Sequence, residues 1–479
     1  MAELRMSAQE TPNRQRQSTP ARGNLARQSV ALATAAAMLM ASVPAHAQRA
    51  GGLPLIRDAE TEQLLKEYTA PILRAAGLAQ QNIRIVIIND RSFNAFVVDG
   101  RRIFVNAGAL MDSKTPNQII GVLAHETGHI AGGHLAKLHQ ELASVQSAMA
   151  LAMLLGIGIA VAGGGRQGTG DAAAAAIMAP QQMAMRSLLS YQRQQEEQAD
   201  KAGVKFLAAT GQSPKGMYDT FKRFADQILF SAQFADPYAQ SHPMPKERID
   251  SLAAIATGSP LWEKKDPAEL QLRHDLMRAK LHGFLDRADT LARAYPMNDN
   301  SLPARYARTI ATYRHGSVAN SISQIDTLIA AQPNNPYFHE LKGQALLEAG
   351  RPAEAIAPLR HAASIAPDPT LIQVMLAQAL LATNNPKMAD EAVSALQIAV
   401  QRDPDIPDAY TNLAMAYGRK GDIPHADLAS AQAAATRGDF TTARQLATRA
   451  KGRFPIGSPG WVKADDLASY KPPAGIARR

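Results

Sequence analysis

The alternation of apolar and polar positions predicts a helix, three short strands and a second helix in the first part of the chain. Apolar residues recur at helical spacing in the first segment, as in an amphipathic helix. Three runs rich in β-branched and aromatic residues follow, and Asp99-Gly100 before the third is a hairpin turn signal. A small antiparallel sheet is therefore expected. The predicted elements are the helix 55–76, the strands 83–88, 93–98 and 102–106, and a helix beginning near Pro116.

An unusually apolar stretch occupies residues 145–189 and contains a Gly-rich loop at 163–170. Almost no charge interrupts its two arms, which favours a buried helical hairpin. A Met-rich apolar surface is also adaptable, so contact with a membrane or with an unfolded client protein is the alternative.

From about Asp266 the pattern becomes repetitive, with small residues and closing prolines at regular distances. The closing prolines are 37, 34 and 37 residues apart, close to the 34-residue period of the tetratricopeptide repeat. Each such unit buries its apolar face only by stacking on its neighbours. The pattern therefore predicts a helical solenoid, with 336–369 as its clearest unit. The closing prolines are Pro296, Pro333, Pro367 and Pro404.

The N-terminus has the features of an export signal. Several arginines precede an apolar run at 30–43, and Ala45-His46-Ala47 fits a cleavage site. An uncleaved membrane anchor is the alternative, although about 14 apolar residues are short for a span. We therefore expect four parts. They are a signal peptide at 1–47, a catalytic domain at 48–262, a repeat domain at 263–460 and a C-terminal tail at 461–479.

Composition narrows the function further. Aromatic residues make up only 5% of the chain, which favours a mainly α fold over sandwiches or barrels. The absence of cysteine excludes disulfides, thiolate metal sites and cysteine nucleophiles. The net charge of +9 is partly carried by the expected signal peptide, and no basic stripe indicates nucleic-acid binding.

The strongest chemical signal is His125-Glu126-Thr127-Gly128-His129 in the helix that begins near Pro116. Residues four apart share one face of a helix, so both imidazoles can bind one metal ion. Glu126 then lies beside the metal and can take a proton from an attacking water. Two incidental histidines on a solvated helix are the alternative, but the preceding residues 119–123 are mostly apolar and predict a buried helix.

A catalytic zinc site needs a third protein ligand. His134 lies one residue before the position that one class of zinc peptidases uses, so its side chain should point away and serve a structural purpose. Glu196 and Asp200, four residues apart in a later helical segment, are better candidates. Glu196 is the expected ligand and Glu197 the competing choice. Asp200 can accept the second N–H of a ligand histidine and fix its tautomer.

These residues resemble the gluzincin peptidases that include HtpX and the CAAX prenyl proteases. The resemblance rests on the motif 125–129 with Glu196 and Asp200, and on segment 94–110, which is similar to the edge-strand segment before their active-site helix. With the export signal and the repeats, the chain looks like the β-barrel assembly-enhancing protease (BepA) group. The resemblance implies a zincin-type domain with one Zn²⁺ per subunit.

Residues 241–249 also look like that group, in which the histidine equivalent to His242 is proposed as a reversible extra zinc ligand that blocks the site. The alternative is that His242 only caps a turn in a proline-rich, non-helical loop. Arg248 either pairs with Asp200 or stabilises the transition state.

The expected function is therefore that of an exported zinc metalloendopeptidase in the periplasm. The resemblance implies that it acts on unfolded or misassembled outer-membrane proteins, docks on the barrel-assembly machinery through its repeats and has chaperone activity. Extended substrates should add a strand near 102–106. One alternative is a latched peptidase that works mainly as a periplasmic chaperone or binding module, and another is a membrane-anchored peptidase that spans the bilayer with 145–189.

Overall fold

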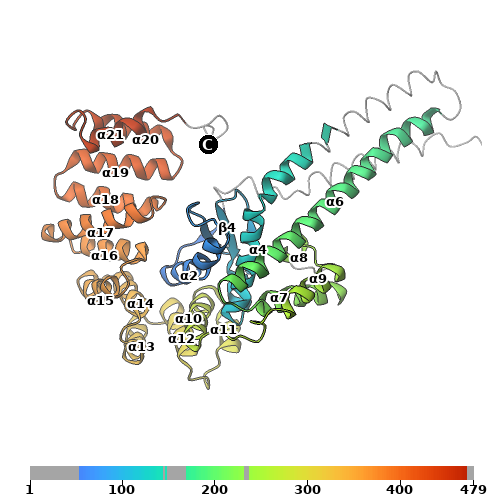
Figure 1. Ribbon diagram of the computed structural model, residues 1–479. Coiled ribbons are helices and arrows are strands. Elements are labelled where there is room, and N and C mark those ends of the chain that lie inside the picture. The colour runs from blue at the N-terminus through green and yellow to red at the C-terminus, as the bar shows by residue number, and fades with distance from the viewer. Residues whose placement is uncertain (1–52, 144–145, 148–168, 231–236, 472–479) are drawn as a thin grey trace, which may run out of the picture. The chain divides into compact units, whose positions relative to one another are not determined.

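The computed structural model describes residues 53–143, 146–147, 169–230 and 237–471. All of its helices and strands belong to one compact unit, Pro54–Arg479 (Figure 1). The expected signal peptide at 1–47 and residues 148–168 of the apolar stretch lie outside the described residues. In the part of the chain that is described, no helix combines the length and the apolar character that crossing a membrane requires.

The sheet is mixed, not antiparallel as the sequence suggested. Its order is β1-β2-β4-β3, and the two central strands run parallel, with Arg84 opposite Arg102 and Ile88 opposite Asn106. The hairpin turn at Asp99-Gly100 is present, but it folds β4 back into the space between β2 and β3, which places β4 parallel to β2. The strands are β1 Leu55–Ile56, β2 Arg84–Ile88, β3 Ala95–Val97 and β4 Arg102–Asn106.

This order changes the expected substrate edge. The strand 102–106 pairs with neighbours on both sides, so it has no free edge for a peptide. The free edge next to it belongs to β3. A substrate strand near 102–106, as predicted from the sequence, is therefore excluded by the topology.

The helix α4 (Pro116–Ala131) is the centre of the catalytic domain. Thr115 and Gln118 form a reciprocal capping box at its first turn, which fixes where it begins. Two glycines of α4 allow neighbouring helices to pack closely against it. A Cβ at Gly121 would overlap Met217 of α7, and a Cβ at Gly128 would come too close to the carbonyl of Ala199 in α6. Other helices of this domain are α2 Ala59–Ala75, α3 Ala107–Asp112, α6 Thr169–Ala209, α7 Lys215–Phe230, α8 Pro237–Ser241 and α9 Lys246–Thr257, and residues 134–143 are also helical.

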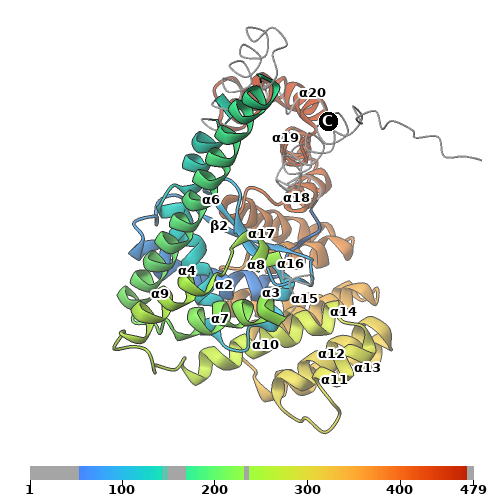
Figure 2. The same ribbon diagram turned by 90° about the vertical axis from the view of Figure 1, so that its right-hand side faces the viewer.

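The helical prediction for the second arm of the apolar stretch is confirmed, because α6 is one continuous helix of 41 residues. Its C-terminal half packs against α4 and α9 (Figure 2).

The second half of the chain is a stack of helix pairs, as the repeat period predicted (Figure 1). In the clearest unit Gly343 of α14 leaves room for Leu359 of α15, where a Cβ would overlap the leucine. Residues 461–469 of the expected tail are helical and pack Ala464 into the last small core. The helices are α10 Ala268–Leu285, α11 Ala288–Ala294, α12 Leu302–His315, α13 Val318–Ala331, α14 Pro336–Glu348, α15 Pro352–Ile365, α16 Thr370–Ala382, α17 Ala389–Arg402, α18 Pro407–Arg419, α19 Ile423–Thr436, α20 Phe440–Lys451 and α21 Pro459–Ser469.

A buried ionic cluster joins α2 of the catalytic domain to the first repeats. Lys280 of α10 lies 2.5 Å from Asp58 and 3.5 Å from both Glu60 and Glu340. The hydroxyl of Tyr306 donates a hydrogen bond to Glu60 at 3.0 Å. Because Lys280, Glu60 and Glu340 are buried, removing a partner of any of them would leave a polar or charged group without compensation at this junction.

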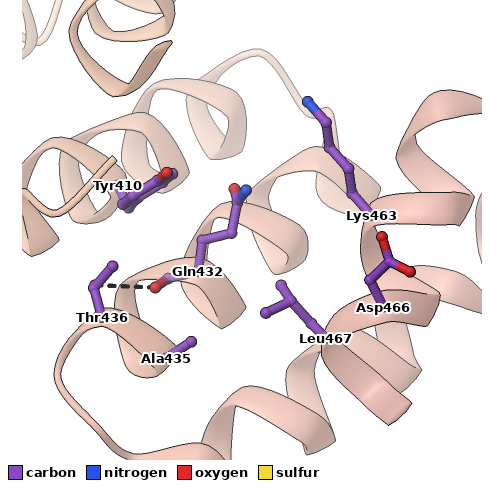
Figure 3. Close-up of a pocket in the computed structure, with 7 residues that line it drawn as sticks. All are labelled: Tyr410, Gln432, Ala435, Thr436, Lys463, Asp466 and Leu467. Carbon is purple, nitrogen blue, oxygen red and sulfur yellow. Dashed lines mark hydrogen bonds between the residues drawn. The ribbon is translucent and has the colours of Figure 1, made fainter. Parts of the chain in front are cut away.

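A pocket opens at the end of the repeat stack between α18, α19 and α21 (Figure 3). Its lining combines apolar side chains with one cationic and one anionic side chain. The lining residues are Tyr410, Gln432, Ala435, Thr436, Lys463, Asp466 and Leu467.

Candidate active site

The helix α4 carries the first part of the site in a dry environment. His125 is fully buried and Glu126 is 1% exposed. The Nε2 atoms of His125 and His129 lie 3.0 Å apart, because residues four apart project from the same face. The buried helix predicted for this motif is therefore confirmed.

The helix α6 brings the carboxylate. Glu196 lies with Oε2 3.4 Å from Nε2 of His125 and Oε1 3.4 Å from Nε2 of His129. Glu197 projects elsewhere and pairs with Lys201 at 3.8 Å. Of the two acids considered from the sequence, the structure therefore places Glu196 beside both histidines.

Asp200 lies one helical turn further along α6 and faces the other side of His125. Its Oδ1 is 2.9 Å from Nδ1 of His125. Arg248 of α9 holds Asp200 with two hydrogen bonds, from Nε at 2.7 Å and from Nη2 at 2.9 Å. Arg248 also contacts Glu196 at 2.8 Å through Nη1. Of the two roles considered for Arg248, its geometry matches pairing with Asp200.

His242 lies inside the same cluster. Its Nδ1 is 3.3 Å from Nε2 of His125 and 3.0 Å from Oε2 of Glu196, and its Nε2 is 3.5 Å from Oε1 of Glu126. The segment before it is not the loop expected from its prolines. Pro237 occupies the first turn of the short helix α8, where a missing N–H costs nothing, and the helix ends just before His242.

The four side chains fit a zinc ion. Tetrahedral coordination with bonds of about 2.0–2.1 Å places ligand atoms about 3.3–3.4 Å apart. The distances among His125 Nε2, His129 Nε2, Glu196 and His242 Nδ1 given above run from 3.0 to 3.4 Å, and all four ligand atoms lie within 4.8 Å of one another. Nitrogen and carboxylate donors together suit zinc, whereas calcium and magnesium prefer oxygen alone.

Electrostatics within the site follow from burial and charge pairing. Burial disfavours the charged form of His125, but hydrogen bonds with Asp200 and Glu196 outweigh it and raise its pKa to about 9. Burial raises the pKa of Glu126. Burial acts in the same direction on Glu196, but His242 and Arg248 hold its pKa well below the ordinary value. Glu126 Oε1 makes no hydrogen bond to any described residue, which leaves it available to a water.

The sequence analysis expected the His134 side chain to point away from the site. In the structure it points toward His129 instead. Its Nδ1 lies 3.0 Å from Nδ1 of His129. The expectation assumed that the helix continues, whereas α4 ends at Ala131 and Gly133 adopts a left-handed conformation with φ of 63°. The helix is interrupted at Gly132 and Gly133 and resumes at His134, so the direction of the His134 side chain is not that of a continuous helix and its ring contacts His129.

Two aromatic residues of the site were missed by the sequence analysis. Tyr238 is fully buried with its ring centroid 4.7 Å from that of His242, and Phe221 lies edge-on to His125 at 5.1 Å. Both lie far along the chain from the motif 125–129, and an isolated aromatic residue carries no motif. The position of Tyr238, four residues before His242, was the one available signal.

Comparison with known proteins agrees with this geometry. Residues 58–256 match the model of Peptidase family M48, and residues 306–369 match a tetratricopeptide repeat model. The protein is therefore a metalloendopeptidase that carries tetratricopeptide repeats, and its cluster of three histidines and Glu196 fits a zinc ion.

The particular proteins that it resembles are β-barrel assembly-enhancing proteases. The one from Escherichia coli (strain K12) is 23% identical over 359 residues, which cover 71% of this chain and 69% of the relative. The one from Yersinia pestis is 22% identical over 366 residues, or 74% and 73% of the two chains. Metalloprotease YcaL of Escherichia coli (strain K12) is 29% identical over 37% of this chain and 63% of the relative. Among solved structures, MamA from Desulfovibrio magneticus RS-1 is 18% identical with a TM-score of 0.26 over 48% of this chain and 96% of that chain, a likeness too low to define the fold.

Proposed function

We propose that this protein is an exported endopeptidase that hydrolyses misfolded or stalled outer-membrane proteins in the periplasm. The observation that carries the proposal is the convergence of His125, His129 and Glu196 next to the buried base Glu126. The names of the relatives, which refer to β-barrel assembly, support the substrate class. The proposed division is a signal peptide at 1–47, the catalytic domain at 48–262 and the repeats at 263–460.

The proposed chemistry assigns one task to each residue. His125, His129 and Glu196 hold the zinc ion, which when bound supplies the Lewis acid that polarises a peptide carbonyl. Glu126 accepts a proton from the attacking water through Oε1 and then donates it to the leaving amine. Asp200 accepts the Nδ1 proton of His125, so that Nε2 keeps its lone pair for the metal. Arg248 keeps Asp200 ionised and fixed in place.

The substrate is proposed to bind as an extended strand on the free edge of β3. The amide of Asn106 donates to the carbonyl of Asn94 at 2.9 Å, so in this antiparallel pair the backbone groups of Phe96 also point toward β4. Those of Ala95 and Val97 then point outward to the free edge. The strand β3 also contacts α4, so a peptide on this edge would run past the active-site helix.

His242 is proposed to regulate access to the zinc ion. With Nδ1 as a fourth protein ligand, it occupies the position that an attacking water needs. Its exposure is only 6%, so this position is also closed to solvent. A short segment between α8 and α9 carries it, so it can leave without displacing the other three ligands.

The repeats are proposed to dock the protein on the barrel-assembly machinery. Tetratricopeptide arrays present extended surfaces to protein partners, and the pocket of Figure 3 is one such feature. Chaperone activity toward unfolded client proteins is part of the same proposal. The apolar stretch 145–189 would then contribute a client contact or a peripheral membrane contact.

One experiment tests the enzymatic proposal. Casein hydrolysis and zinc content are measured for the purified protein and for Glu126→Gln, which keeps the shape of the side chain but cannot accept the proton. We expect about one zinc ion per chain in both proteins and a loss of about 10²–10⁴-fold in rate for the variant. Equal hydrolysis by both would contradict the role of Glu126.

A second candidate function follows from the burial of His242 among the ligands. A permanently latched site would leave the protein as a periplasmic chaperone or binding module. In that case both proteins would bind zinc, neither would hydrolyse casein, and His242→Ala would not release activity.

A further inference from the structure

His134 reaches the metal cluster from the side opposite to the zinc position. Its Nδ1 is 3.0 Å from Nδ1 of His129, and the two rings meet edge to face with centroids 5.0 Å apart and an interplanar angle of 85°. His134 is 3% exposed. His125 has the carboxylate of Asp200 at the corresponding nitrogen. The two ligand histidines therefore have different partners, a carboxylate and an imidazole.

The turn that follows α4 has a shape that permits this contact. Gly132 has ordinary helical dihedrals (φ −75°, ψ −12°), so its backbone alone would accept any residue. A Cβ at Gly132 would, however, overlap the His134 ring at Nε2 and Cδ2. Gly133, with φ of 63°, adopts the left-handed conformation that interrupts the helix before residues 134–143 continue as a new helical segment. Gly132 thus leaves space for the His134 ring, and Gly133 supplies the backbone conformation that precedes it.

We infer that His134 is a positioning residue that holds His129 in its zinc-binding tautomer. When Nε2 of His129 binds the metal it carries no proton, so Nδ1 must be protonated and needs an acceptor. The only ring nitrogen that His134 presents at 3.0 Å is its own Nδ1, which must then be unprotonated. The inference rests on the proposed function, because it takes His129 to be a ligand.

The test compares two amides at position 134 in the full-length protein. The oxygen of an asparagine can occupy the place of Nδ1, whereas glutamine places its oxygen further out, near the place of Nε2. Zinc affinity is measured by competition with a chromophoric chelator. We expect His134→Ala and His134→Gln to weaken zinc binding about 10–100-fold, and His134→Asn to recover most of that loss.

A double variant separates this effect from general damage to the fold. Gly132→Ala should weaken zinc binding through the displaced His134 ring. In the background of His134→Ala the ring is gone, so adding Gly132→Ala should cause no further loss. Additive losses would overturn the inference, as would unchanged zinc affinity in His134→Ala or equal affinities of the asparagine and glutamine variants. Thermal unfolding of the metal-free proteins should be the same for these two amide variants.

The outcomes also separate this inference from the proposed function. If the unmodified protein binds no zinc, the proposed function fails. If it binds zinc and loses it in His129→Ala but keeps it in His134→Ala, the proposed ligand set stands and the positioning role of His134 is wrong.

Discussion

Replacing Asp200 by alanine should weaken the catalytic domain in two separable ways. Asp200 is 3% exposed and accepts two of the four hydrogen-bond or ion-pair contacts of the Arg248 guanidinium. The other two go to the carbonyl of Pro243 at 2.9 Å and to Glu196 at 2.8 Å. Asp200 also faces Nδ1 of His125 at 2.9 Å. Its removal therefore leaves a buried cation half paired and a ligand histidine without its acceptor.

The two consequences have different sizes. Removing one partner of a buried ion pair typically costs about 3–5 kcal/mol of folding stability, because the remaining charge stays buried. Arg248 is itself only 3% exposed, so water cannot replace the lost carboxylate without local opening. Losing the second partner of a metal-binding histidine weakens metal binding about 10–100-fold. That factor corresponds to about 1.4–2.7 kcal/mol of binding free energy.

The assay measures urea unfolding of the metal-free protein and zinc affinity by chelator competition. Asp200→Asn is the matched control, because it keeps the shape and one acceptor oxygen. The double variant Asp200→Ala with Arg248→Met removes the stranded charge, so much of the lost stability should return. Zinc affinity should stay low in the double variant, because His125 still lacks its acceptor.

Recovery of zinc affinity together with stability would refute this reasoning, since it would mean that Asp200 acts on the metal only through the fold. A change in zinc affinity below about threefold in Asp200→Ala would refute the orienting role directly.

Three further predictions concern the latch, the substrate edge and the junction. His242→Ala should raise basal casein hydrolysis and keep zinc; loss of zinc would make it an obligatory ligand, and unchanged activity would favour the turn-capping alternative. Val97→Pro removes a backbone N–H from the free edge of β3, so it should raise KM for extended peptides while zinc content stays unchanged. Val97→Ala keeps this N–H and should leave KM unchanged. Equal KM values for the two variants would exclude substrate binding at this edge. Burial raises the pKa of Glu60 and of Glu340 from 4.5 to about 7, against the attraction of Lys280. A carboxyl group whose pKa is raised in the folded state makes the protein less stable as pH rises from its unfolded pKa to its folded pKa. The stability of Glu60→Gln relative to the unchanged protein, measured by thermal unfolding, should therefore increase between about pH 4.5 and 7. A stability difference that stays constant over this range would contradict the prediction.

Local patterns were sufficient for the elements that depend on nearby residues. The buried helix of 125–129 follows from apolar periodicity and its Thr115 cap, and the repeats follow from their spacing, because both are fixed by interactions within a few turns of chain. The i,i+4 relation of Glu196 to Asp200 was likewise local. The parallel pairing of β2 with β4 could not be predicted from local patterns, because strand order depends on where a hairpin inserts into the sheet. The signal for a hairpin turn is the same in a mixed and in an antiparallel sheet.

Residue types and their spacing showed which side chains could form a zinc site, but which of these side chains meet depends on how distant helices pack. Only the packing of α9 against α6 pairs Arg248 with Asp200, and only the end of α8 brings His242 to within 3.3 Å of His125. His134 shows the reason most clearly. Its position relative to His129 depends on one left-handed residue, Gly133, and a single change of φ redirects every side chain that follows.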